Sequence, residues 1–212
     1  GQEFANKIRT IPGGVFLEQY KSSPEAQEKI NKKYSLKDKK VVLFTGRLTQ
    51  HKGVDYLIKA ARTIKGEVLI LGDGPERANL EKLIKDLKLT NTRILGYMSP
   101  KEQVSFRDFY SRADVYVAPS TWNEPLGLVI LEAMAARTPV VSTRAGGVTS
   151  LIKDGYTGYL IRPRNAKEIA EKGLRIGDVV EAINGKQVGG VEEFNSLINN
   201  EYSENATFVI RT

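Results

Sequence analysis

The sequence contains no cysteine, a single histidine and no Asp-x-Asp pair. The absence of cysteine excludes a disulfide framework, an iron-sulfur site and a zinc site built from thiolates. With one histidine and no closely spaced aspartates, few side chains remain that could assemble a transition-metal site. We therefore expect a protein whose chemistry needs no bound metal.

Long apolar runs are also missing. No stretch approaches the roughly 18 residues that a helix needs to cross a bilayer. The first residues, Gly-Gln-Glu-Phe, have neither the basic start nor the apolar segment of a secretion signal. These absences predict a soluble, cytoplasmic protein without stable membrane insertion.

The composition that is present is that of an ordinary globular protein, with 212 residues, 41% of them apolar and 27% charged. The formal net charge of +7 is unevenly distributed: residues 1–172 hold 29 basic and 19 acidic side chains, and residues 173–212 hold 3 and 6. A basic balance suits nucleic acid, an anionic membrane or a small phosphorylated ligand. No run of lysine and arginine interleaved with aromatic residues occurs, which argues against nucleic acid as a partner.

Short apolar runs rich in β-branched residues alternate with stretches of helical period from Lys39 onward. The runs predicted as strands are 41–44, 68–71, 93–95, 115–117, 140–141 and 159–161. The predicted helices cover about 53–64, 80–87, 100–111, 126–136, 147–152 and residues from 166 onward. Continuously apolar strands between helices indicate a parallel sheet covered on both faces. The predicted fold class is α/β, a Rossmann-like doubly wound sheet of about six strands.

In such a sheet, ligands bind beyond the carboxyl ends of the strands. We therefore expect the functional residues in the turns that follow the strands. Arg47 and Lys52 follow the first predicted strand. Two cations at this edge make a site for a phosphate or diphosphate, and a solvated basic loop is the alternative. His51, which lies between them, is interpreted as a surface residue.

Two glycine pairs occupy other turns of this edge. Gly72-x-Gly74-Pro75 has only part of a dinucleotide-binding fingerprint, so a structural turn is the favoured interpretation. Gly146-Gly147 fits two interpretations equally well, a tight turn or a place where a ligand approaches the backbone.

Glu124 and Glu132 are eight residues apart, at the start of a predicted helix and two turns inside it. A carboxylate among apolar helical residues such as Leu128 and Leu131 is costly to bury without a partner. A hydroxyl-rich ligand would account for Glu132, and so would a salt bridge to a neighbouring lysine or arginine.

The run from Pro119 to Ala135 resembles the Glu-x7-Glu signature of family 4 retaining glycosyltransferases. Five further motifs occur in that family's order and spacing, at 46–47 with 52–53, at 72–75, at 95–98, at 146–147 and at 154–158. The resemblance covers about residues 7–172. It corresponds to the C-terminal, donor-binding half of the two-domain GT-B architecture.

The resemblance implies roles for particular residues. Gly46 and Arg47, together with Lys52, would hold the donor diphosphate and stabilise the leaving nucleoside diphosphate without metal. Glu132 would accept the ribose hydroxyls and Glu124 would hydrogen-bond to the transferred sugar. The remaining contacts would come from the backbone, at Leu126, Gly127 and Leu128 toward the phosphate and at Tyr97 and Met98 toward the base.

The implied function is metal-independent binding of a nucleotide-sugar donor for glycosyl transfer, with the leaving phosphate acting as the base and no cofactor required. The donor, a nucleoside diphosphate sugar, is the expected small-molecule partner. The family's N-terminal acceptor domain has no counterpart here, so residues 1–172 alone are expected to be inactive. One departure affects the loop after Gly147, because Thr149 and Ser150 follow Val148 where the family usually carries glutamate.

The family pattern stops after Lys172, and residues 173–185 are similar to the second half of a PDZ domain. Asn184-Gly185 predicts a two-residue turn between strands, 191–199 a helix and 207–210 a closing strand. We therefore predict a nucleotide-sugar-binding domain at 1–172 and a partial PDZ-like segment at 173–212. The peptide-binding part of a PDZ domain has no counterpart, so docking onto the first domain or self-association is expected of this segment.

The abrupt switch between two patterns and the glycine at position 1 also fit a recombined or engineered chimera. The alternative function is thus an interaction module whose PDZ-like tail mediates assembly without catalysis.

Overall fold

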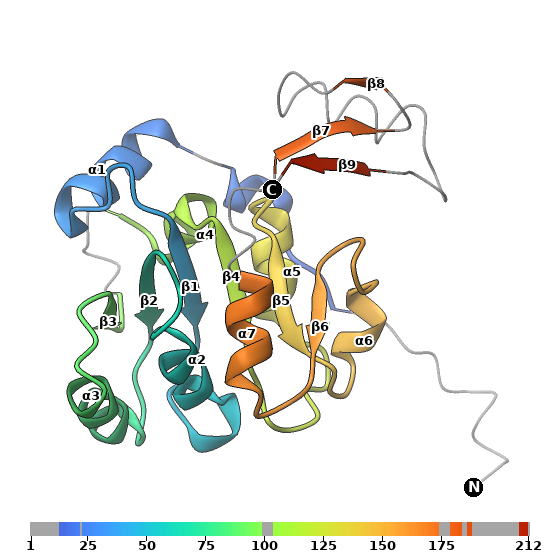
Figure 1. Cartoon of the computed structure of the whole chain (residues 1–212). Coiled ribbons are helices and arrows are strands. Elements are labelled where there is room, and N and C mark those ends of the chain that lie inside the picture. Colours follow the sequence, from blue (N-terminus) through green and yellow to red (C-terminus); the bar gives the residue numbers. More distant parts are fainter. Residues whose placement is uncertain are drawn as a thin grey trace, which may run out of the picture. The chain divides into compact units, whose positions relative to one another are not determined.

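The computed structural model describes residues 13–21, 23–98, 104–173, 179–183, 186–187 and 208–211 (Figure 1). The chain divides into two compact units, residues 1–174 and 175–212. The first contains a six-stranded sheet with its helices, and the second contains a three-stranded sheet.

All six strands of the first unit are parallel, in the order β3-β2-β1-β4-β5-β6. Their bounds are β1 (Val41–Thr45), β2 (Glu67–Leu71), β3 (Thr92–Gly96), β4 (Val115–Ala118), β5 (Val140–Thr143) and β6 (Tyr159–Ile161). The chain moves outward from β1 to β3 and then returns to place β4 beside β1, with Val42 opposite Val115. The predicted Rossmann-like sheet is confirmed, and its strand order reverses between β1 and β4.

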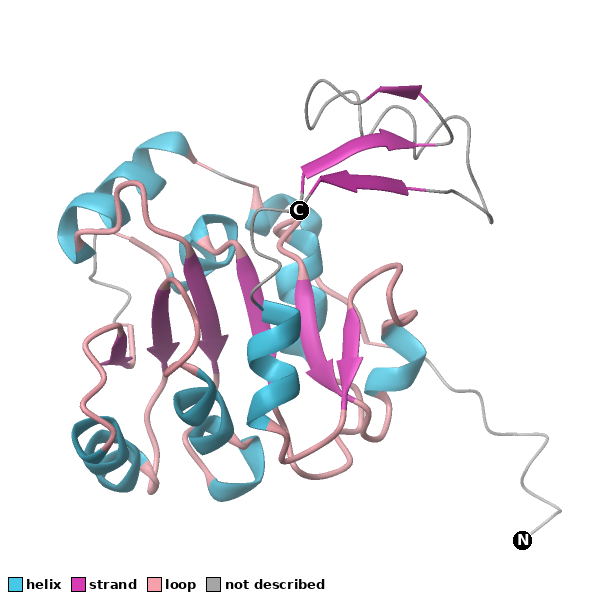
Figure 2. Cartoon of the chain, viewed as in Figure 1, coloured by secondary structure: helices cyan, strands magenta, loops and turns pink. Residues whose placement is uncertain are grey.

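Helices cover both faces of this sheet. Their bounds are η2 (Leu17–Tyr20), α1 (Pro24–Tyr34), η3 (Gln50–Lys52), α2 (Val54–Ala60), α3 (Arg77–Asp86), α4 (Phe106–Arg112), α5 (Leu128–Ala135), α6 (Val148–Leu151) and α7 (Ala166–Gly173). Helix α2 contacts α3 and α7, whereas α4 contacts α1, α5 and η2. Figure 2 shows α2 and α7 in front of the sheet and α5 behind it.

The helix α1 and the short helix η2 precede every element expected from the sequence. The Ser23 hydroxyl caps α1 by accepting from the Ala26 backbone N–H at 3.3 Å, and Pro24 occupies the first helical position. Ile30 is the one fully buried side chain of α1. The Ser-Pro start was the available signal for this helix, whose apolar face is narrow.

Glycines allow the ends of β1 and β2 to approach each other closely. A Cβ on Gly72, where φ is +149°, would lie 1.8 Å from the Gly46 carbonyl oxygen, and a Cβ on Gly74 would lie 2.3 Å from that of Leu48. Both contacts are with backbone, which cannot swing aside. The interpretation of Gly72-x-Gly74 as a structural turn is confirmed.

Replacing Gly72 with alanine should therefore lower the free energy of unfolding by roughly 2 kcal/mol, because the new Cβ meets backbone in a conformation that costs about 1–3 kcal/mol. Chemical denaturation followed by circular dichroism measures this loss. Gly14→Ala is the matched control, since nothing lies within 4 Å of a Cβ there, and it should be neutral. Equal stability of the two variants would contradict the close approach.

The second unit is an antiparallel sheet in the order β8-β7-β9, formed by β7 (Val179–Ile183), β8 (Lys186–Gln187) and β9 (Phe208–Arg211). Ile183 pairs with Lys186, as the predicted two-residue turn requires. The expected closing strand is confirmed one residue later than predicted. The turn residues 184–185 and the predicted helix 191–199 lie outside the described residues.

Candidate functional site

The loops that follow β1 and β4 lie side by side at the carboxyl edge of the sheet, where its strand order reverses. The Thr121 backbone N–H donates to the His51 carbonyl at 2.8 Å, and the Thr121 hydroxyl donates to the same oxygen at 3.3 Å. Ligands bind at such reversal points in open α/β sheets. The structure therefore joins the turn that carries Lys52 to the turn that carries Glu124.

Lys52 and Glu124 form an ion pair across these two loops. Lys52 Nζ lies 2.5 Å from Glu124 Oε1, and the two side chains are 24% and 13% exposed. The Ser120 hydroxyl donates to the same oxygen at 2.6 Å, and the Trp122 indole also hydrogen-bonds to the carboxylate. The sequence predicted both residues as members of one site but not that they bind each other.

Opposing effects act on the pKa of the Glu124 carboxyl. Burial raises the pKa, because a charged carboxylate loses hydration. Hydrogen bonds from Lys52, Ser120 and Trp122 favour the charged form and outweigh burial, so the pKa lies below its ordinary value. Glu124 is therefore a charged hydrogen-bond acceptor at neutral pH.

Glu132, on α5, is held by two phenols. The Tyr110 hydroxyl of α4 donates to Glu132 Oε2 at 2.6 Å, and the Tyr20 hydroxyl at the end of η2 also hydrogen-bonds to Glu132. The salt bridge considered for Glu132 is wrong within the described residues, where no ion pair includes it. Hydroxyl groups, which are smaller donors without charge, stabilise this carboxylate instead.

A chain of hydroxyls continues from Glu132 into the sheet. Tyr110 Oη lies 2.6 Å from Thr45 Oγ1, which lies 3.2 Å from Tyr116 Oη. Both phenols are fully buried, and burial raises the pKa of each well above its ordinary value. Both phenols therefore stay protonated. They connect Thr45, at the end of β1, with the carboxylate of Glu132 through hydroxyl groups that do not ionise near neutral pH.

The other residues predicted to bind a ligand are more exposed. Arg47 follows Gly46 at the end of β1; its side chain is exposed, and no hydrogen bond or ion pair joins it to another residue in the described part of the chain. After β3, Tyr97 is 79% exposed, whereas Met98 is partly buried against the core. Arg47 is thus a cation at the ligand edge that no internal partner neutralises.

Leu126, Gly127 and Leu128 lie at the start of α5. Gly127 is the N-cap with φ of 78°, and no side chain caps the helix. The first N–H groups of a helix lack acceptors within the helix, and the helix dipole favours negative charge at this end. The start of α5 can therefore donate backbone hydrogen bonds to an anion.

Gly146 and Gly147 support the loop that carries Glu124. A Cβ on Gly147 would lie 2.0 Å from the Pro125 carbonyl oxygen, and a Cβ on Gly146 would lie 2.4 Å from that of Glu124. The Gly147 backbone N–H also donates to the Glu124 carbonyl at 2.7 Å. Of the two interpretations offered by the sequence, the tight turn accounts for both glycines.

The described ranges contain neither a cluster of metal-ligating side chains nor a membrane-spanning helix. No group of three or more histidine, cysteine, aspartate or glutamate side chains that could hold a metal ion occurs among these residues. Among the same residues, no helix combines the length and the apolar character needed to cross a bilayer.

Fold and site together define a Rossmann-like domain that carries two cations, Arg47 and Lys52, and two glutamates, Glu124 and Glu132, at the edge where its strand order reverses. Residues 26–176 match the sequence family described as glycosyl transferases group 1, and the chain belongs to this family. An uncharacterised glycosyltransferase of Methanocaldococcus jannaschii is 36% identical over 173 residues, which are 78% of this chain and 43% of that protein. The chain thus spans less than half the length of this relative.

Solved structures of the family share the fold. HepE of Anabaena, in complex with UDP or with UDP-glucose, superimposes with a TM-score of 0.70 at 29% identity, covering 77% of this chain and 46% of HepE. The C-terminal domain of a glycosyl transferase group 1 protein from Francisella tularensis has a TM-score of 0.61 at 25% identity and covers 75% of this chain and 85% of that domain. The first unit therefore has the Rossmann-like GT-B fold.

The residues that hold the two glutamates were not predicted from the sequence. Ser120 and Trp122 are in the run that carries the resemblance, so their nearness to Glu124 was a usable signal. Tyr20 and Tyr110 look like core aromatics in the sequence, and only the packing of η2 and α4 against α5 shows that their hydroxyls reach Glu132.

Proposed function

We propose that residues 1–172 are the donor-binding domain of a retaining glycosyltransferase that binds a nucleoside diphosphate sugar without metal. The observation that carries this proposal is the arrangement around Glu132. Within the described part of the chain, its carboxylate is oriented by neutral phenols and is not paired with a cation, so it stays available to accept hydrogen bonds from ribose hydroxyls.

The proposed roles of the other residues follow their positions. Arg47 and Lys52 bind the diphosphate, with the backbone at the start of α5 and at Gly46 as further donors. Glu124 accepts a hydroxyl of the transferred sugar, and the backbone near Tyr97 and Met98 meets the base. Support comes from the solved complexes of HepE with UDP and with UDP-glucose.

Glycosyl transfer is proposed to require, in addition, an acceptor-binding domain. The segment that matches this chain makes up 43% of the Methanocaldococcus jannaschii relative and 39% of a second relative. For residues 173–212, the half-PDZ interpretation and a role in self-association stay predictions. The antiparallel strands β7, β8 and β9 are compatible with them but common to many small folds.

Nucleotide binding tests the proposed function directly. UDP, GDP or ADP at 100 times its dissociation constant should raise the free energy of unfolding by about 2.7 kcal/mol. Arg47→Ala should weaken the bound nucleotide about tenfold, because a charge-assisted hydrogen bond contributes about 1.5–3 kcal/mol. Isothermal titration calorimetry and thermal melting measure the two effects.

Arg62→Ala is the matched control for Arg47→Ala. Arg62 is also exposed, but it follows α2 and precedes β2, which places it at the opposite edge of the sheet. Its replacement should leave nucleotide affinity unchanged. Absence of binding by all three nucleotides, or equal losses in the two variants, would sink the proposal.

A further inference from the structure

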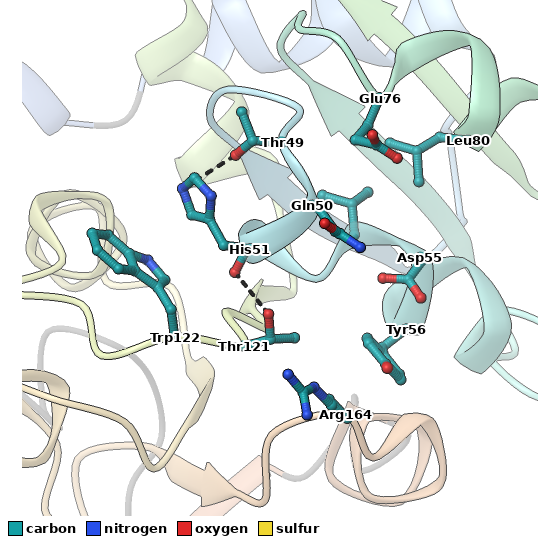
Figure 3. Close-up of a pocket in the computed structure, with 11 residues that line it drawn as sticks. Thr49, Gln50, His51, Asp55, Tyr56, Glu76, Leu80, Thr121, Trp122 and Arg164 are labelled. Atoms are coloured by element: carbon teal, nitrogen blue, oxygen red, sulfur yellow. Dashed lines mark hydrogen bonds between the residues drawn. The ribbon is translucent and has the colours of Figure 1, made fainter.

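A hollow of about 510 Å³ lies at the carboxyl edge of the sheet and is lined by residues from five segments. Gln50 comes from η3, Tyr56 from α2 and Glu76 from the start of α3, while Trp122 and Arg164 come from the loops after β4 and β6. Figure 3 shows these side chains arranged around the hollow. The volume falls within the roughly 300–1,000 Å³ of ordinary small-molecule sites.

The lining presents hydrogen-bonding groups that the protein does not use. Within the described residues, the Gln50 amide, the Tyr56 hydroxyl and the Arg164 guanidinium have no hydrogen-bond partner. Asp55 gives one carboxylate oxygen to Lys59 Nζ at 2.8 Å and keeps the other. The hollow therefore offers donors and acceptors in similar numbers to whatever occupies it.

The charges of the lining decide between ligand classes. The lining contains two carboxylates, Asp55 and Glu76, and one guanidinium, Arg164. Because Lys59 pairs with Asp55 from outside the lining, the hollow has no excess of positive charge that would attract a phosphate or a nucleic acid. Val54 and Leu80 are the only aliphatic residues in the lining, which is too little apolar surface to favour a lipid. A neutral ligand that both donates and accepts hydrogen bonds fits the lining best.

Carbohydrates have this chemistry. Each sugar hydroxyl donates one hydrogen bond and accepts others, which matches carboxylates beside an amide and a guanidinium. Trp122 is 45% exposed and supplies a flat apolar surface on which the C–H face of a sugar ring can lie.

The hollow is distinct from the proposed donor site, although the two share walls. Glu132 and Tyr110 belong to α5 and α4, whereas the hollow is lined from α2 and α3. Trp122 connects the two, because its indole hydrogen-bonds to Glu124 while its ring lies 5.0 Å from the His51 ring in the lining.

We propose that this hollow is a binding site for a neutral oligosaccharide, separate from the site of the nucleotide. The proposal does not depend on the donor site, since none of its evidence comes from Glu132, Arg47 or the start of α5.

Trp122 makes the test direct, because it is the only tryptophan in the sequence. The full chain, without nucleotide, is titrated with maltotriose, cellotriose and mannotriose while tryptophan fluorescence is recorded. At least one of these neutral probes should give a saturable change with a dissociation constant in the millimolar range. No saturable change with any of the three would overturn the proposal.

Substitutions in the lining test whether the fluorescence change comes from sugar bound in the hollow. Gln50→Ala and Asp55→Asn should each weaken the responding sugar at least tenfold. Lys59→Met is the matched control for Asp55→Asn, because Lys59 is outside the lining and its replacement breaks the same ion pair, together with a contact to the Tyr56 ring. This variant should bind the sugar normally. Equal losses in Lys59→Met and Asp55→Asn would assign the effect to the ion pair and overturn the proposal.

A last variant separates this site from the donor site. Glu132→Ala should keep the sugar response even where it loses nucleotide binding. Loss of the sugar response in Glu132→Ala, or displacement of the sugar by inorganic pyrophosphate, would place the sugar in the donor site and overturn the proposal. Failure of nucleotide binding with an intact sugar response would instead count against the proposed function alone.

Discussion

Replacing Glu132 with alanine should weaken the binding of UDP about 100-fold and leave the binding of inorganic pyrophosphate unchanged. In the proposed site this carboxylate accepts both ribose hydroxyls, and hydrogen bonds to a charged group contribute about 1.5–3 kcal/mol each. Pyrophosphate has no ribose, so its affinity depends on Arg47, Lys52 and the start of α5. Isothermal titration calorimetry with the two ligands measures the difference.

Tyr110→Phe tests whether the phenol positions that carboxylate. Loss of the hydroxyl removes the 2.6 Å hydrogen bond to Glu132 Oε2 and should weaken UDP about tenfold, again without effect on pyrophosphate. Tyr116→Phe is the matched control, because this equally buried phenol hydrogen-bonds to Thr45 and not to Glu132. Both variants should lose about 1–3 kcal/mol of unfolding free energy by leaving a buried group without its partner, but only Tyr110→Phe should change UDP affinity.

Comparing UDP with pyrophosphate distinguishes the loss of a ribose contact from the loss of the shape of the site. A variant that loses affinity for UDP and pyrophosphate in equal proportion has lost the shape of the site rather than a contact with ribose. That outcome for Glu132→Ala would contradict the role given to this residue.

The sheet was predictable because most of its strands contain a continuous apolar run. Runs such as 41–44 and 68–71 carry enough β-branched residues to be recognised, and parallel strands separated by helices leave few possible strand orders. The helix α1 was missed for the opposite reason. Ile30 is its one buried residue, and most of the rest of its sequence is polar.

The site was predictable only as a set of residues. Lys52 and Glu124 are 72 positions apart, and Tyr110 and Glu132 are 22 apart. The turn glycines and the Glu-x7-Glu spacing place these residues at one edge. Which cation meets which carboxylate, however, depends on how the loops pack through contacts such as Thr121 with His51, and no local pattern encodes that packing.

The pH dependence of the free energy of unfolding should show whether Lys52 and Glu124 form an ion pair in the folded protein. The pKa of Glu124 is lower in the folded chain than its ordinary value of about 4.3. The pair therefore contributes stability above that ordinary pKa and loses it as pH falls through the lower, folded pKa. The difference in unfolding free energy between wild type and Glu124→Gln should stay constant from about pH 8 to 5 and shrink toward pH 3.

The same substitution should have opposite effects on the two ligands of the donor site. In the structure Lys52 Nζ is occupied by Glu124 Oε1 at 2.5 Å, so a diphosphate must compete with a carboxylate that also repels it. Glu124→Gln removes that charge with little change in shape and should tighten UDP binding about threefold to tenfold. UDP-glucose should instead bind more weakly, because its sugar loses the charged acceptor proposed for it.

The measurement of interest is therefore the ratio of the affinity for UDP-glucose to the affinity for UDP. This ratio should fall about tenfold or more in Glu124→Gln. Glu25→Gln controls for net charge, since Glu25 is an exposed residue in the first turn of α1 and its replacement should leave the ratio unchanged. If Glu124→Gln shifted UDP and UDP-glucose equally, Glu124 would act only on the lysine and not on the sugar. Its partner Lys52 would then be the sole link between this ion pair and the donor.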